Sequence, residues 1–136
     1  MKNVNILLVE DNEGDILLTT EAFEECKSIK KINIIKDGAS AIDFLIKNLI
    51  NLPDLILLDI NLPKKNGHEV LSFIKKNKKL NHIPVIMLTT SSSDVDIHSS
   101  YKNHANCYLT KPIDVGEFFN LIKKIEEFWI KLVTFP

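Results

Sequence analysis

The chain has 136 residues, of which 45% are hydrophobic and 26% charged, and its formal net charge is -1. This size and composition fit one globular domain with one buried core. The balanced charge gives no electrostatic basis for nucleic acid as a direct partner, and the apolar runs are far shorter than the ~20 residues of a membrane-spanning helix. The two cysteines lie far apart and no secretory signal precedes them, so we expect a cytoplasmic protein with reduced thiols.

Short apolar runs alternate with segments that have the spacing of amphipathic helices. In chain order, we expect strands at residues 5–9, 32–36, 55–60, 85–88 and 106–109, each followed by a helix, at 14–26, 39–48, 67–76, 94–104 and 115–132. Asn12 and Asp114 stand where side chains cap the first and last of these helices. Five strand–helix units predict an α/β fold, with a parallel sheet covered on both faces, in a single domain over residues 1–136.

Acidic residues follow two of the predicted strands. Right-handed crossovers restrict the winding of such a sheet, and we adopt the flavodoxin-like order 2-1-3-4-5, in which the first and third strands are neighbours. Glu10 and Asp11 then meet Asp59 at the carboxyl edge of the sheet, with Lys111 close by after the fifth strand. Such carboxylates repel one another unless a divalent cation lies between them. The arrangement predicts a metal site that leaves a carboxylate and a lysine for chemistry.

Four short segments match one family when they are taken together. They are Val9-Glu10-Asp11-Asn12, Leu58-Asp59-Ile60-Asn61-Leu62-Pro63 with Gly67 after it, Leu88-Thr89, and Leu109-Thr110-Lys111-Pro112. The chain resembles the receiver domain of two-component response regulators over essentially its whole length. The tail at 127–136 and the run at 89–93 are similar to the stand-alone, phytochrome-associated receivers.

The resemblance implies that Asp59 accepts a phosphoryl group from a histidine kinase, which for this subgroup is a phytochrome-like kinase, and forms an acyl phosphate. It also implies a Mg²⁺ ion held by Asp11, Asp59, Glu10 and the backbone carbonyl of Asn61. The family commonly has two aspartates where this chain has Glu10 and Asp11. Asp11 is therefore the expected direct ligand, and a water-mediated role for Glu10 stays open.

Three more residues take roles from the same resemblance. Lys111 is expected to neutralise the phosphoryl oxygens, with a cis bond before Pro112 directing it inward. Thr89 is expected to donate its hydroxyl to a phosphoryl oxygen, and Tyr108 matches the aromatic residue that rotates when this threonine moves.

Two other sets of polar residues have plainer interpretations. The histidines at 68, 82, 98 and 104 show no metal-ligand spacing with cysteine, so we expect them at exposed polar positions. The lysine-rich run at 75–79 is expected to be a solvated helix end. The helix at 94–104 has few apolar residues, which suits an element that is easily displaced and reports phosphorylation.

The last predicted helix carries more apolar surface than one core contact requires. Its apolar residues spread over an arc of about 200°, whereas one core contact takes a stripe of about 100° or somewhat more. We expect a homodimer through the face formed by the segments 94–104, 106–109 and 115–132, and the alternative is that the tail folds back over its own domain. The proposed interface residues are Phe128, Trp129, Leu132 and Tyr101.

The favoured function is a phosphoacceptor switch and not an enzyme, and three alternatives remain. The first is a receiver-like interaction module that is not phosphorylated. The second is an aspartyl-phosphate phosphatase, whose chemistry usually needs an acid where this chain has Asn61. The third is a nucleotide- or flavin-binding module, which the acidic loop at 10–15 disfavours because it lacks a glycine-rich phosphate cradle.

Overall fold

A computed structural model describes residues 3–90 and 93–136. Ser91 and Ser92, which belong to the run at 89–93, lie outside the described residues. The described chain contains a five-stranded parallel sheet in the order β2-β1-β3-β4-β5, so the predicted order is confirmed. The strands are β1 (Val4–Val9), β2 (Ile29–Ile35), β3 (Leu55–Leu58), β4 (Val85–Thr89) and β5 (Cys107–Thr110).

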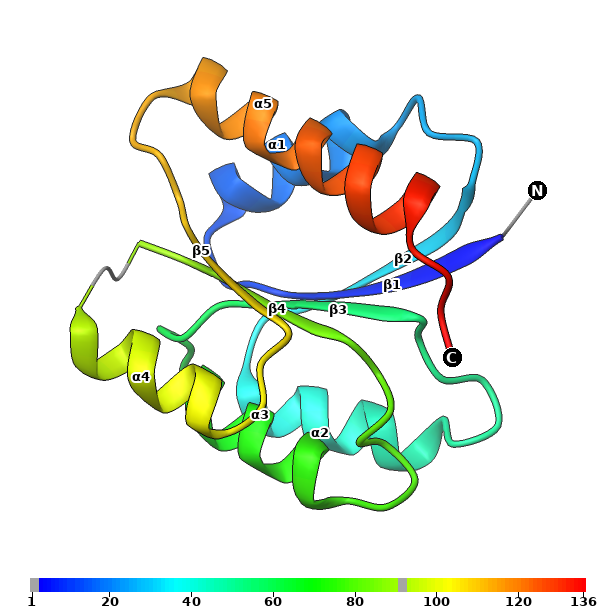
Figure 1. Cartoon of the computed structure of the whole chain (residues 1–136), viewed down its shortest axis with the longest axis vertical. Helices are drawn as coiled ribbons and strands as arrows, with labels where there is room; N and C mark the ends of the chain where they lie inside the picture. The colour runs from blue at the N-terminus through cyan, green and yellow to red at the C-terminus, as the bar shows by residue number, and fades with distance from the viewer. Residues whose placement is uncertain (1–2, 91–92) are drawn as a thin grey trace.

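Helices cover both faces of the sheet (Figure 1). They are α1 (Glu13–Phe23), α2 (Gly38–Lys47), α3 (Gly67–Lys76), α4 (Asp94–Lys102) and α5 (Val115–Ile125), followed by a π-helix, η1 (Glu126–Leu132). In Figure 1, α1 and α5 lie on one face, and α2, α3 and α4 lie on the other. None of the helices formed by the described residues is long and apolar enough to cross a membrane.

The central strands are buried on both faces because their sequences are apolar without interruption. All four residues of β3 are fully buried. Successive side chains of a strand point to opposite faces, so Leu7 and Val9 of β1 join one core cluster while Ile6 and Leu8 join the other. The two layers of core thus share one sheet, whose carboxyl edge is left for polar residues.

Side-chain caps fix where the helices begin. The Asn12 carboxamide accepts a hydrogen bond from Asp15 N at 2.9 Å, and Asp114 accepts one from Glu117 N at 2.9 Å, which confirms both predicted caps. At α3, Asn66 and Glu69 form a reciprocal capping box. Caps of this kind typically stabilise a helix by about 1 kcal/mol each.

The prediction of one continuous helix over residues 115–132 is wrong, because the helical pitch changes part-way along it. The α-helix ends at Ile125 and the chain continues as η1, whose backbone hydrogen bonds join residues five apart, so that each turn holds more residues than an α-helical turn. Ile130, five residues after Ile125, is therefore buried, and Trp129 is left half-buried. Phe135 packs back against the same core cluster, close to the start of β1. The tail does fold over its own domain, as one of the two alternatives expected.

Candidate functional site

The carboxyl edge of the sheet brings Glu10 and Asp59 side by side. The last paired residues of β1 and β3 are Val9 and Leu58. Backbone hydrogen bonds continue one residue further, from Asp59 N to Val9 O at 3.1 Å and from Glu10 N to Ile35 O at 3.0 Å. Both acidic residues are thus held by the sheet itself, although β3 ends two residues earlier than predicted.

Three carboxylates converge at this edge, as the sequence predicted. Glu10, Asp11 and Asp59 each offer an oxygen, and these atoms all lie within 4.8 Å of one another. Glu10 and Asp59 are 3% and 6% exposed, whereas Asp11 is exposed. Carboxylate oxygens are the ligands that Mg²⁺ prefers, and a ligand on the solvent side suits an ion that keeps several waters. The donor set therefore fits a hard divalent cation.

Lys111 lies inside this cluster and not at the surface. It is 6% exposed, and its ammonium contacts the carboxylate of Glu10. It also donates to Asp15 Oδ2 at 2.9 Å and to Asp59 Oδ2 at 3.1 Å. Its backbone N–H donates to Thr89 O at 2.8 Å, which fixes the lysine against the end of β4. The positive charge of Lys111 is thus held beside the Asp59 carboxylate.

Burial and charge act in opposite directions on this cluster. Burial raises the pKa of Glu10 to about 7, against the lowering effect of the Lys111 ammonium. For Lys111, burial lowers the pKa, but the hydrogen bond with Glu10 and the charges of Asp59 and Glu10 outweigh it and hold the pKa above its ordinary value. Lys111 is therefore charged at neutral pH, and its charge opposes the burial that favours the neutral form of Glu10.

Asp15 is the site residue that sequence reasoning missed. It lies in the first turn of α1, its carboxylate is about a quarter exposed, and it accepts from Lys111. The signal was an acidic residue three positions after the predicted cap Asn12, in the first turn of the predicted helix and close in sequence to Glu10 and Asp11. The prediction included Asp15 in the helix at 14–26 and in the acidic loop at 10–15, but gave it no role in the site, whereas α1 begins at Glu13 and turns its carboxylate to Lys111.

The loop after Asp59 is packed tightly against the start of α3. Asn61 N donates to Asp59 Oδ1 at 3.3 Å, and Gly67 N donates to Ile60 O at 2.8 Å. A Cβ at Gly67 would lie 2.1 Å from the carbonyl oxygen of Asp59, so only glycine fits. Asn61 is exposed at the rim of the carboxylate cluster. Its backbone carbonyl remains a predicted ligand.

Strand register places Thr89 and Tyr108 on the same face of the sheet. Met87 pairs with Tyr108, and Thr89 is two residues further along β4. Residues two apart on a strand point to the same face, and both Met87 and Tyr108 belong to the cluster beneath α2 and α3. Thr89 is fully buried, and Tyr108 is half-buried. The two residues are diagonal neighbours, and their coupling remains a prediction.

The residues predicted for a partner interface differ in exposure. Tyr101, Phe128 and Leu132 are 50%, 54% and 75% exposed. Trp129 is half-buried and meets Phe128 edge-on, with ring centroids 5.6 Å apart. The Tyr101 hydroxyl accepts a hydrogen bond from Tyr108 N at 3.2 Å, so it also ties α4 to β5.

Three expectations away from the cluster are corrected. His68 is half-buried and its ring bonds Asp96 at 3.1 Å, which joins α3 to α4, whereas His82, His98 and His104 are exposed as predicted. Lys75 is not a solvated lysine, since its ammonium donates to Ile83 O at 2.7 Å. The predicted cis bond before Pro112 is wrong. The peptide bond there is trans, the form most X–Pro bonds take.

Comparison with known proteins decides the family. The model of the response regulator receiver domain matches residues 6–123, most of the chain. The chain belongs to the response regulator receiver domain family. It is therefore a receiver domain of two-component signalling, and proteins of this family receive phosphoryl groups from histidine kinases.

Close relatives include phytochrome-associated regulators, as the subgroup resemblance predicted. Response regulator Rcp1 of Synechocystis sp. is 44% identical over 135 residues, covering 96% of this chain and 92% of the relative. The probable methanogenesis regulatory protein FilR2 of Methanothrix harundinacea is 43% identical over 128 residues, covering 92% and 83%. The crystal structure of the phosphorylated cyanobacterial phytochrome response regulator RcpA has a TM-score of 0.94 at 43% identity, and that of Mn²⁺-bound Rcp1 has 0.92 at 43%. Each covers 98% of this chain and 99% of the neighbour.

Proposed function

We propose that Asp59 accepts a phosphoryl group from a histidine kinase in a reaction that requires Mg²⁺. The observation that carries the proposal is the position of Asp59. It is buried at a sheet edge, shares a cation-binding cluster with Glu10 and Asp11, and bonds the Lys111 ammonium. Support comes from the relatives, since Rcp1 has been crystallised with Mn²⁺ and RcpA in a phosphorylated form.

In the transfer, an Asp59 oxygen forms a bond to phosphorus while the bond from phosphorus to the donor's histidine nitrogen breaks. The product is an acyl phosphate, and the proton that the imidazole nitrogen gains comes from solvent. Asp11, Asp59, Glu10 and the carbonyl of Asn61 would hold Mg²⁺, which when bound neutralises the phosphoryl oxygens. Lys111 would supply a second positive charge, since its ammonium already contacts the Asp59 carboxylate.

The same chemistry favours a switch over an enzyme. A phosphatase with an aspartyl intermediate needs a general acid near its nucleophile, and the residue two positions after Asp59 is Asn61. The acyl phosphate instead changes what Thr89 bonds. Because Thr89 and Tyr108 are diagonal neighbours on one face, movement of the first shifts the second and with it α4.

Incubation with acetyl phosphate and Mg²⁺ followed by intact mass measurement tests the proposal. The wild type should gain the mass of one phosphoryl group, and chelation of the metal should prevent the gain. Asp59→Asn should gain nothing, whereas Asp43→Asn, which removes an exposed carboxylate on α2, should behave as wild type. If the wild type stays unmodified with a competent kinase also present, the chain is a receiver-like interaction module.

We further propose a phytochrome-like histidine kinase as donor and a homodimer that uses the α4–β5–α5 face, with no direct contact to nucleic acid. The dimer is supported by the exposed Phe128 and Leu132, which lie together on η1. Sedimentation should show a dimer that Phe128→Ser/Leu132→Ser converts to a monomer. The control is Ile50→Ser, which removes an apolar residue that is 95% exposed after α2. A monomeric wild type would refute the dimer.

A further inference from the structure

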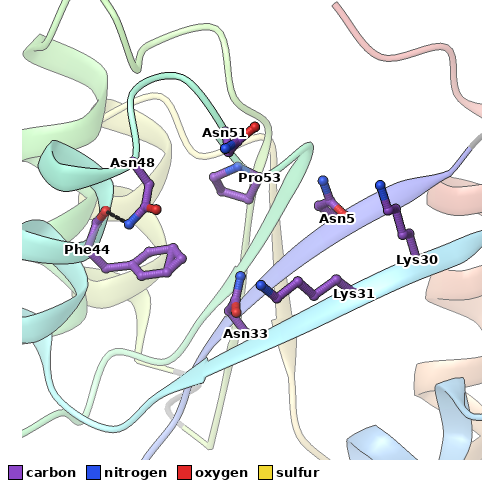
Figure 2. A pocket seen from close by; sticks show the side chains of 8 residues that line it. All are labelled: Asn5, Lys30, Lys31, Asn33, Phe44, Asn48, Asn51 and Pro53. Atoms are coloured by element: carbon purple, nitrogen blue, oxygen red, sulfur yellow. Dashed lines mark hydrogen bonds between the residues drawn. The ribbon is translucent and has the colours of Figure 1, made fainter.

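We propose that a pocket at the amino ends of β1 and β2, on the edge opposite Asp59, binds a nucleotide. The pocket has a volume of about 360 Å³ and is lined by four asparagines, two lysines, Phe44 and Pro53. It lies between the two strands, the end of α2 and the segment that leads into β3 (Figure 2). Its volume is at the lower end of the range of roughly 300–1,000 Å³ that holds small organic ligands.

A β-bulge places both lysines at this pocket. Val4 pairs with Ile29, but the next residue, Asn5, pairs with Lys31, so Lys30 is an extra residue in β2. In a regular strand two successive side chains point to opposite faces, whereas a bulge redirects one of them. Lys30 and Lys31 both line the pocket as a result (Figure 2).

The positive charge of the pocket has no counter-charge in its walls. No Asp or Glu is among the lining residues, and the structure gives neither Lys30 nor Lys31 an ion pair with any residue that it describes. The nearby Asp54 is engaged, since its carboxylate accepts from Asn5 N at 2.8 Å. Two ammonium groups on a wall of neutral side chains favour a ligand that carries a phosphate.

The remaining lining residues suit a planar base. Each carboxamide offers a donor and an acceptor, the pattern that matches the edge of a nucleobase. Asn5 Oδ1 is buried and makes no hydrogen bond within the described chain, so a hydrogen-bonding group is left for a ligand. Asn48 is held in place by its bond to Phe44 O at 2.7 Å.

Phe44 supplies the apolar surface for the face of the base. Its ring extends from α2 toward Asn33 and Lys31 (Figure 2). An aromatic ring stacks on any base, which contributes about 1–3 kcal/mol in nucleic-acid-binding proteins. A bound nucleotide would place its phosphate on the two lysines, the edge of its base against the carboxamides and the face of its base on Phe44. These three contacts together use the polar and aromatic lining of the pocket. The overall charge of -1 favours a mononucleotide over a polyanion.

Calorimetry and amide chemical shifts on the full chain test the proposal, with AMP, GMP, CMP and UMP as probes. At least one of them should bind with shifts confined to the pocket, and adenosine or inorganic phosphate should bind at least about tenfold more weakly. Lys30→Gln/Lys31→Gln should weaken binding about tenfold, the equivalent of about 1.4 kcal/mol. The charge-matched Lys78→Gln/Lys79→Gln, at exposed positions after α3, should bind as wild type.

Three outcomes would overturn the assignment. They are no binding of any mononucleotide, equal binding of inorganic phosphate, and equal loss in the two lysine double variants. Asn33→Leu gives a second variant that leaves both charges in place, and it should weaken nucleotide binding while the melting temperature shows that the fold persists. Asp59→Asn should bind nucleotide as wild type does, so failure of phosphorylation and failure of this site are distinguishable.

Discussion

Helices α3 and α4 lie on the same face of the sheet but are held to it very differently. Four of the ten residues of α3 are buried, and a capping box fixes its start. In α4, Ser100 is the one buried residue of nine. The Ser100 hydroxyl has no hydrogen-bond partner among residues 3–90 and 93–136, and an unsatisfied buried group of this kind costs about 1–3 kcal/mol. α4 is therefore the weakly held element.

This difference separates the part of the site that must stay fixed from the part that can move. α3 begins at Gly67, against the backbone of Asp59, so its packing fixes the proposed phosphoacceptor. The contacts that join α4 to the rest of the described chain include polar ones, from Tyr108 N to the Tyr101 hydroxyl and between His68 and Asp96. Polar contacts exchange partners at low cost, whereas buried methyl groups do not. A signal that begins at Asp59 is thus expected to leave α3 in place and displace α4.

The largest expected effect is at the start of α3. Gly67→Ala should lower the free energy of unfolding by about 3 kcal/mol, because its Cβ would meet the Asp59 carbonyl. Gly116→Ala in the first turn of α5 is the control, since its Cβ would approach only the Asp114 carboxylate, at 3.2 Å. Urea denaturation measures both, and equal small changes would show that the α3 junction is not tight.

A matched pair of isoleucines compares the two helices directly. Ile74→Ala in α3 should cost about 3 kcal/mol of stability, because the residue is fully buried. Ile97→Ala in α4 should cost about 1 kcal/mol, because that residue is only half-buried. The same denaturation assay measures both variants. Similar losses would mean that α4 is anchored as firmly as α3.

Amide hydrogen exchange compares how readily α3 and α4 open. The amides of α4 should open at a free energy about 2 kcal/mol lower than those of α3, because fewer apolar groups hold the helix. Phosphorylation by acetyl phosphate should change exchange in α4 and leave α3 unaltered. High protection of α4 that phosphorylation does not alter would argue against its role as the moving element.

The smallest expected effect concerns the hydroxyl that joins α4 to β5. Tyr101→Phe should cost no more than about 1 kcal/mol, since it removes one exposed hydrogen bond that the Tyr101 hydroxyl accepts from Tyr108 N. Exchange of the Tyr108 amide should nevertheless rise. Tyr101→Phe is conservative in shape, so an unchanged Tyr108 amide would show that this bond does not hold the two elements together.

The sequence by itself determined the order of the helices and strands, most of their positions, and the acidic residues that meet at the sheet edge. Apolar spacing and capping residues act locally, so elements such as α3 and the caps Asn12 and Asp114 were predicted correctly. Glu10, Asp11 and Asp59 could be brought together because parallel strands end at one edge. That step used a strand order adopted from known folds, since apolar runs do not encode which strands are neighbours.

Tertiary structure decided what depends on contacts between distant residues. Glu10 and Lys111 are 101 residues apart in sequence, and only the folded sheet buries their ion pair and adds Asp15 to it. The π-turn that buries Ile130, like the bulge that places Lys30 at a pocket, shifts side chains by one position. A prediction from periodic apolar residues assumes a constant helical pitch and a regular pairing of strands, so it cannot include a shift of one residue. Packing against the rest of the chain decides where such a shift occurs.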